Sequence, residues 1–278
     1  MLRTDALASL YLFHPWRRRS SPPGRVPILM YHSVSGCRQE DRHPYYQTVT
    51  TPEVFDSQMK FLRENGYTVV SLHEAVNRIE SSSGPTTQPV VITFDDGFQD
   101  FYTNAFPILH KYEFSAAVFL PTAHVGEVTR SFNGIECLTW SQVRELQSAG
   151  IEFGSHTVTH PELKNLNTDD LRYELRSSKE TIEERLGRPV KSFAYPYAFP
   201  ETNRSFREKL RGMLEESGYE NGVSTILGTA DRTGDRYFMK RLPINTHDDT
   251  RLFKAKLEGA YDWLHAVQYA SKLMTTKR

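Results

Sequence analysis

Residues 90–97 read Val-Val-Ile-Thr-Phe-Asp-Asp-Gly, an apolar run that ends in two adjacent carboxylates. A short, continuous apolar run followed by turn residues is typical of a strand buried on both faces, as in a parallel sheet. Similar runs on either side of it predict further strands at 26–31, 68–70, 115–120, 151–154, 192–195, 222–225 and 237–244.

Helices are predicted between these strands, because helix start signals precede amphipathic segments. Thr51-Pro52 supplies an N-cap and a first helical residue, Thr139-Trp-Ser-Gln142 reads as a capping box, and Thr168 is predicted to cap a long helix. Strand and helix alternate about seven times without an internal repeat, which predicts a single parallel α/β barrel of the (β/α)7 type. The predicted helices span 51–62, 98–112 with a kink at Pro107, 139–150, 168–187, 203–217 and 249–269, and one more begins at 71.

The composition excludes several classes of protein. The 278 residues include 34 Lys and Arg and 34 Asp and Glu, with net charges of +4 in residues 1–25, −8 in 26–239 and +4 in 240–278. A net charge of zero predicts no bulk attraction to nucleic acid, and no nucleic-acid partner is expected. An apolar fraction of 38%, before glycine is added, excludes a disordered chain. Cys37 and Cys137 fit no disulfide framework, as is typical of a reducing compartment.

The N-terminus lacks the pattern of a signal peptide, and the chain lacks the apolar run of ~18 residues that a membrane span needs. Asp5 and His14 interrupt the apolar stretch, and the arginine cluster follows it. We therefore expect a cytoplasmic protein. It is predicted to consist of a basic N-terminal arm at 1–25 and one barrel domain at 26–278.

The N-terminal arm combines apolar side chains with the basic run Arg17-Arg18-Arg19. One hypothesis is that residues 7–19 make peripheral contact with an anionic membrane surface at the inner face of the membrane. The alternative is an arm that packs on the domain or frays. The apolar residues concerned are Leu7, Leu10, Tyr11, Phe13 and Trp16.

Titratable residues gather where the predicted strands end, and in a parallel barrel those ends meet at one face. Asp95 and Asp96 are adjacent at a strand end, so one carboxylate can bind a metal while the other faces a water or a substrate. His156 and His160 are separated by three residues and can converge on one ion. Two histidines and one carboxylate leave a position open for water, as a catalytic divalent metal requires. The alternative is an ordinary Asp-Asp-Gly turn with two capping histidines.

These motifs resemble those of the polysaccharide deacetylases, carbohydrate esterase family 4. The family's first motif, Thr-Phe-Asp-Asp-Gly, stands at Thr93–Gly97, and its second, His-Ser/Thr-x-x-His, stands at His156–His160. The segments Tyr31–Val34 and Phe193–Tyr197 look like the branch that includes exopolysaccharide N-deacetylases. The resemblance covers residues 27–244 and implies a distorted barrel.

The resemblance also implies roles for individual residues. Asp95 would be the general base, and Asp96, His156 and His160 would hold a divalent ion, Zn²⁺ first, with Co²⁺ and Ni²⁺ as alternatives. The backbone N–H of Tyr197 would stabilise the oxyanion. The implied reaction is hydrolysis of an acetamido group on an N-acetylated saccharide, with release of acetate.

The sequence departs from the family in its third motif. Ala194-Tyr-Pro-Tyr-Ala198 has neither the arginine that orients the base nor the final glycine, and Arg241 on the last strand is a candidate replacement. For the general acid, His247 after the last strand and His32 after the first are rival candidates.

Two other functions fit the same residues. An O-acetyl esterase could use the same metal site, and a catalytically impaired homologue could bind carbohydrate without turnover. The loops at 36–46 and 122–138 carry no recognisable substrate code, so exopolysaccharide, chitin fragments, peptidoglycan and lipid-linked precursors all remain open.

Overall fold

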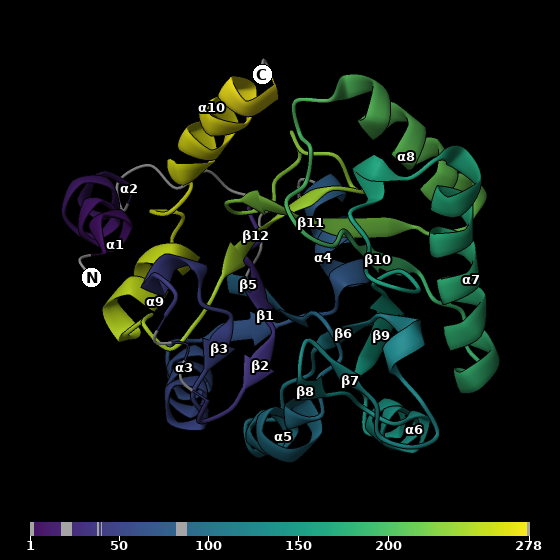
Figure 1. Cartoon of the computed structure of the whole chain (residues 1–278). Coiled ribbons are helices and arrows are strands. Elements are labelled where there is room, and N and C mark those ends of the chain that lie inside the picture. Colours follow the sequence, from purple (N-terminus) through teal and green to yellow (C-terminus); the bar gives the residue numbers. More distant parts are fainter. Residues whose placement is uncertain (1–2, 18–23, 38, 40, 82–87, 277–278) are drawn as a thin grey trace.

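The computed structural model describes residues 3–17, 24–37, 39, 41–81 and 88–276. Within these residues, seven parallel strands form a closed ring in the order β1-β12-β11-β10-β9-β6-β5, because β1 pairs with both β12 and β5. The predicted (β/α)7-type barrel is therefore confirmed (Figure 1). Its strands are β1 (Ile28–Tyr31), β5 (Gln88–Phe94), β6 (Ala117–Leu120), β9 (Glu152–Ser155), β10 (Ser192–Ala194), β11 (Asn221–Leu227) and β12 (Met239–Pro243).

The barrel is distorted by short strands outside the ring. The strand β4 (Tyr67–Val69) pairs in parallel with the first residues of β5, whereas β6 pairs with the last ones. Two small sheets are added by the loops: β2 (Ser33–Val34) with β3 (Val49–Thr50), and β7 (Ser131–Phe132) with β8 (Ile135–Glu136).

Helices surround the barrel, and most begin where the sequence predicts (Figure 1). Thr51 caps α3 (Pro52–Glu64), and Thr139 with Gln142 forms a complete capping box at α6 (Trp140–Ser148). The cap predicted at Thr168 is wrong by one residue, because the Asn167 side chain accepts the backbone N–H groups of the first turn. The remaining helices are α4 (Leu72–Ser81), α5 (Phe106–Lys111), α7 (Thr168–Leu186), α8 (Arg204–Glu216), α9 (Thr250–Leu257) and α10 (Leu264–Thr276).

Two predicted helices differ in detail from the prediction. The helix predicted at 98–112 runs without a break from the π-helical turn η3 (Phe101–Ala105) into α5 (Phe106–Lys111), with Pro107 just after the junction. The segment 249–269 breaks between α9 and α10, where Gly259 takes a left-handed conformation (φ +76°) that side chains disfavour. The Asp262 carboxylate fixes this turn by accepting the backbone N–H of Thr229 at 2.9 Å.

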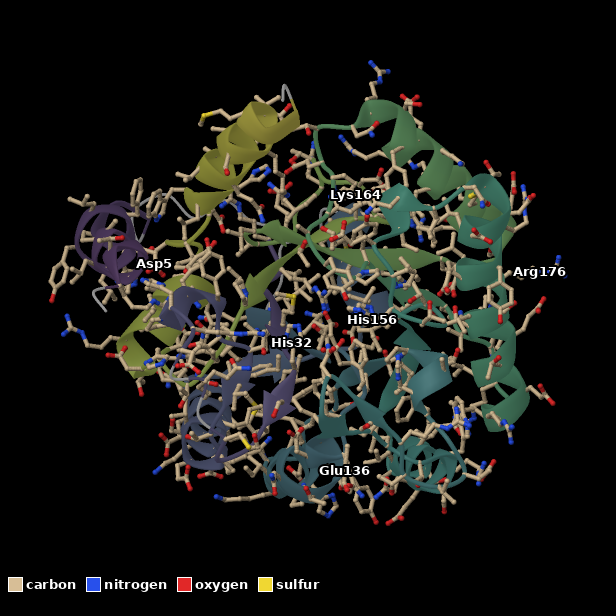
Figure 2. All side chains as sticks on the ribbon, viewed as in Figure 1. Asp5, His32, Glu136, His156, Lys164 and Arg176 are labelled. Atoms are coloured by element: carbon tan, nitrogen blue, oxygen red, sulfur yellow. The ribbon has the colours of Figure 1, made fainter. Side chains whose placement is uncertain are left out.

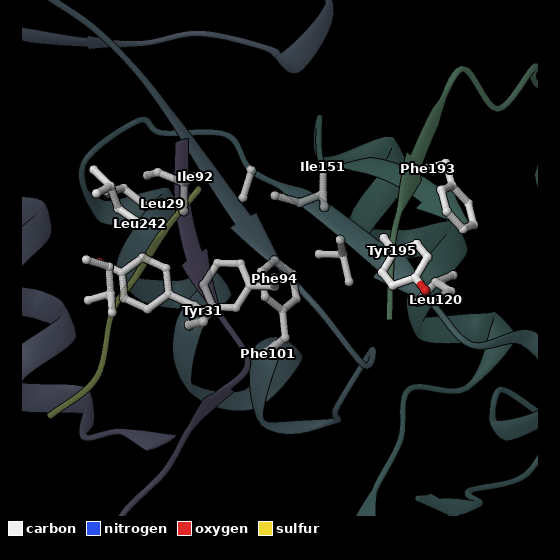
Figure 3. Packing of buried hydrophobic residues seen from close by; sticks show 14 of the residues in the cluster. Leu29, Tyr31, Ile92, Phe94, Phe101, Leu120, Ile151, Phe193, Tyr195 and Leu242 are labelled. Atoms are coloured by element: carbon white, nitrogen blue, oxygen red, sulfur yellow. The ribbon is translucent and has the colours of Figure 1, made fainter. Parts of the chain in front are cut away.

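The core fills the barrel and the space beneath its helices (Figure 3). Tyr31 at the end of β1 and Phe94 at the end of β5 stack with ring centroids 5.3 Å apart, and Phe101 packs edge-on against Phe94 at 4.8 Å. These rings are at most 1% exposed. They fix the ends of β1 and β5 relative to each other, and both strands lead directly into site residues.

The N-terminal residues that the structure describes are packed on the domain. They form α1 (Thr4–Ala8), the π-helical turn η1 (Ser9–Phe13) and α2 (His14–Arg17). Phe13 stacks on Trp263 with centroids 5.0 Å apart, and Trp263 Nε1 donates to Ser9 Oγ. Trp263 therefore holds the N-terminal arm. Among the described residues, no helix has both the length and the apolarity needed to cross a membrane.

Candidate metal centre

Asp96, His156 and His160 converge at the carboxyl ends of the strands. The Nε2 atoms of His156 and His160 lie 3.5 Å and 3.3 Å from Asp96 Oδ1, and the three candidate ligand atoms all lie within 4.8 Å of one another. Figure 2 shows His156 in the centre of the barrel mouth, with His32 nearby. Parallel strands bring these loops together although 60 residues separate Asp96 from His156 in the sequence.

The donor set fits a divalent ion. His156 is 2% exposed and its Nδ1 lies 2.8 Å from Ala194 O, an arrangement in which Nδ1 carries the proton and the Nε2 lone pair faces the site. Burial alone would raise the pKa of Asp96, but the two histidines lower it well below its usual range, so the group is a carboxylate. Among the described residues, Asp96 Oδ1 has no hydrogen-bond partner although it is buried. An ion held between these three atoms would satisfy it.

The loops of the site have strained backbones. Asp96 (φ +69°), His160 (φ +58°) and Tyr197 (φ +58°) all adopt the left-handed conformation, which is uncommon without glycine. Such conformations persist where surrounding contacts hold them and are typical of functional sites.

The buried carboxylate of Glu174 on α7 supports the histidine loop. Its Oε2 accepts the backbone N–H groups of Val158 at 2.7 Å and Thr159 at 2.9 Å, and its Oε1 accepts the Thr159 hydroxyl. Glu174 was missed by sequence reasoning. The sequence does contain a sign of its role, because Glu174 is a charged residue next to Leu175 on the face of the helix that is otherwise apolar.

Arg241 forms a two-pronged ion pair with Asp95, the first carboxylate of the first motif. Its Nη1 and Nη2 donate to the two oxygens of Asp95 at 2.7 Å each, and the side chains are 0% and 3% exposed. Nη1 also donates to Thr93 Oγ1 at 3.2 Å, and Nε donates to Ser224 O at 3.0 Å. The guanidinium is thus fixed in one plane, and the structure places Arg241 where an orienting arginine is needed. Burial would raise the pKa of Asp95, but Arg241 and the nearby histidines lower it.

The two candidate acids occupy different positions. His32 directly follows Tyr31, whose carbonyl oxygen accepts the backbone N–H of Asp95 at 3.0 Å, so the backbone of His32 lies next to the first motif. His247 is exposed, and its Nε2 lies 2.9 Å from Gln47 Oε1. His32 is thus adjacent in the backbone to the first motif, whereas the described partner of the His247 ring is Gln47.

Aromatic side chains near the site divide into two groups. Tyr197 is 49% exposed and packs edge-on against His160, with centroids 4.6 Å apart. Trp140, Tyr195 and Phe199 are at most 3% exposed and belong to the core. Tyr197 is thus the aromatic residue of the third motif that can meet a substrate.

Comparison with known proteins agrees with this geometry. The family model described as polysaccharide deacetylase matches residues 82–221, half of the chain. The chain belongs to the polysaccharide deacetylase family, as the motifs predicted. The zinc identity of the ion stays a prediction.

Individual relatives cover most of the chain. The protein named "Putative polysaccharide deacetylase YxkH" of Bacillus subtilis strain 168 is 29% identical over 242 residues, spanning 87% of this chain and 79% of its own. A poly-beta-1,6-N-acetyl-D-glucosamine N-deacetylase of Staphylococcus aureus strain MRSA252 is 25% identical over 72% of this chain and 69% of its own. The structure of the Streptococcus pyogenes deacetylase PplD in complex with acetate superimposes with a TM-score of 0.74 at 26% identity, covering 85% of this chain and 99% of that one.

Proposed function

We propose that this protein is a metal-dependent hydrolase that removes N-acetyl groups from the amino sugars of a poly- or oligosaccharide and releases acetate. The main support for the proposal is the cluster of three possible metal ligands, Asp96, His156 and His160. Beside it lies a further carboxylate, Asp95, which is held in an ion pair with Arg241. The similarity to an enzyme named as an N-deacetylase of a glucosamine polymer supports the choice of an amide substrate.

Asp96, His156 and His160 would hold the ion, with Zn²⁺ the first expectation and Co²⁺ and Ni²⁺ as alternatives. When bound, a divalent ion supplies Lewis-acid chemistry, polarising a carbonyl and lowering the pKa of water. The Ala194 carbonyl would keep the His156 ring oriented for metal binding, because it accepts a hydrogen bond from Nδ1 and leaves Nε2 facing the site.

Asp95 is the proposed general base. The Arg241 fork occupies both of its oxygens in the plane of the guanidinium and leaves other lone pairs of the carboxylate for a water proton. Against the effect of burial, Arg241 lowers the pKa of Asp95, so the group is ionised at neutral pH, which is the state that a general base requires.

The leaving amine needs a proton, and His32 is the proposed donor. The choice is supported by the backbone bond from Asp95 N–H to Tyr31 O at 3.0 Å, which puts His32 next to the first motif, and by the exposed ring of His247, which lies against Gln47. The backbone N–H of Tyr197 is proposed to stabilise the oxyanion that forms on the acetyl group.

The test is to identify the bond that is broken. Purified protein is incubated with N-acetylglucosamine oligomers and with an O-acetylated saccharide, and acetate and free amine are quantified. Equal amounts of acetate and amine from the amide substrate, lost in the Asp96→Ala variant, are expected. Acetate released only from the ester would replace the proposal with an O-acetyl esterase. Binding of the oligomers without release from either substrate would indicate an impaired homologue.

A further inference from the structure

The outer face of α10 is apolar, the reverse of an ordinary surface helix. Val267 and Met274 are 52% and 69% exposed, and Tyr269 and Leu273 are exposed as well. Among the described side chains of this helix, none on the exposed face is charged. A surface helix normally turns its apolar stripe to the core and its charges to water.

The polar face of α10 is turned inward and fixed there. His265 Nε2 lies 2.7 Å from Glu201 Oε1. The Gln268 amide donates to Thr225 O at 2.9 Å and accepts the backbone N–H of Leu227 at 3.1 Å. These bonds set the rotation of the helix about its own axis, so the apolar face cannot turn toward the domain.

The N-terminal helices continue the same feature. Tyr11 and Leu12 are 61% and 69% exposed, and Leu7 on the preceding turn is exposed too. The stack of Phe13 on Trp263, the residue before α10, joins the two segments, and Figure 1 shows α1, α2 and α10 along one outer edge of the molecule. We call the exposed side chains of Leu7, Tyr11, Leu12, Val267, Leu273 and Met274 the terminal surface.

The charge of the chain favours one kind of occupant for this surface. Leaving out Arg241 and Asp95, which form a buried pair inside the barrel, the segments 1–25 and 240–278 that form the terminal surface carry net charges of +4 and +3, whereas residues 26–239 carry −7. Asp5 is the single acidic residue between residues 4 and 17, and it is buried and paired with Arg3. A negatively charged surface would attract both ends and repel the rest of the molecule, which fixes an orientation. A second copy docked symmetrically would instead oppose the same basic ends.

We propose that the terminal surface docks on an anionic lipid membrane, with its apolar side chains entering the interface while the net positive charge of the two terminal segments of the sequence attracts the protein to the lipid head groups. Exposed apolar side chains beside basic residues are the pattern of peripheral membrane attachment, which combines apolar burial with electrostatic attraction. The proposal extends the contact predicted for residues 7–19 to the C-terminal helix, and it does not depend on the chemistry of the metal centre.

Vesicle flotation of the full chain tests the proposal. Vesicles of phosphatidylcholine alone are compared with vesicles that also contain phosphatidylglycerol, at low and high salt. The double variant Val267→Glu/Met274→Glu changes the helix α10, Leu12→Glu changes the N-terminal segment, and Tyr173→Glu on α7 is the control, because Tyr173 is 55% exposed elsewhere on the surface. All four side chains are exposed, so each variant is expected to keep the circular dichroism of the unaltered protein.

The unaltered chain and the Tyr173→Glu control are expected to float with the anionic vesicles, less so at high salt. Val267→Glu/Met274→Glu and Leu12→Glu should each bind about tenfold more weakly, since they place a carboxylate where an apolar group enters the interface. Equal flotation of all variants, or equal binding to neutral and anionic vesicles, would overturn the proposal. So would a dimer seen by light scattering that Val267→Glu/Met274→Glu abolishes while no variant binds vesicles, because that result would assign the surface to a second copy.

Discussion

Replacing Arg241 with methionine is expected to destabilise the fold by about 3–5 kcal/mol, because it leaves the Asp95 carboxylate buried without its partner. The magnitude follows from the burial of both groups, at 0% and 3% exposed, and from two bonds of 2.7 Å. A surface pair such as Lys60–Glu64, 3.8 Å apart and more than half exposed, contributes at most ~1 kcal/mol by contrast. The loss is large against a usual total of ~5–15 kcal/mol, so the protein should remain folded but weakened.

Urea unfolding of four proteins separates this charge effect from a packing effect: the unaltered chain, Arg241→Met, Asp95→Asn and the double variant. Each single change leaves one buried charge unpaired, whereas the double variant has neither charge. The double variant is therefore expected to be more stable than the sum of the two single losses predicts, by at least ~2 kcal/mol. If the losses of unfolding free energy in the two single variants add up to the loss in the double variant within about 0.5 kcal/mol, the two charges are not coupled. A loss below ~1 kcal/mol for Arg241→Met would show that the pair contributes no more than a surface ion pair.

Four further substitutions, in three experiments, test the proposed acid, the Glu201 pair and the packing of the N-terminal helices. His32→Ala is expected to lower kcat for acetate release by roughly 100-fold or more, and His247→Ala to leave it nearly unchanged; the opposite ranking would return the acid role to His247. Burial would raise the pKa of Glu201, but its histidine partner lowers it, so Glu201 stabilises the fold above its ordinary pKa of ~4.3, and this contribution is lost as the pH falls through the lowered pKa. The difference in unfolding free energy between the unaltered chain and Glu201→Gln should therefore shrink on acidification, and a constant difference would contradict this. Trp263→Ala removes the stack on Phe13 and should speed tryptic cleavage after the N-terminal helices; an unchanged cleavage rate would argue against the packed arm.

Much of the fold could be predicted because the strands are nearly continuous apolar runs. The run at 90–94 is buried along its whole length, and the capping box at Thr139 starts a helix as written. The break between α9 and α10 could not be predicted, because the apolar periodicity continues through Gly259 while the turn depends on contacts from distant parts of the chain. Asp262, for example, accepts from Thr229 and Arg25.

Some features of the site could likewise be predicted from the sequence, and others could not. Asp96 and His156 could be paired from the sequence, because parallel strands deliver their carboxyl ends to one face of a barrel. The choice between His32 and His247 as the proposed acid could not be made from the sequence, since both follow strands and the contact of the His247 ring with Gln47 depends on the three-dimensional path of the loops. The position of Glu174 on the apolar face of its helix could have marked it as unusual, but its partners, the backbone N–H groups of the histidine loop, could not be predicted from the sequence.

Asp96, His156 and His160 are proposed to hold a divalent ion on which amide hydrolysis depends. The most direct measurement is acetate release from N-acetylglucosamine oligomers by protein freed of metal with a chelator and then titrated with Zn²⁺. Activity is predicted to be absent without the ion and to rise until about one ion per chain is bound, while Asp96→Ala stays inactive at every concentration. Acetate release that survives the chelator, or that persists in Asp96→Ala, would contradict the claim.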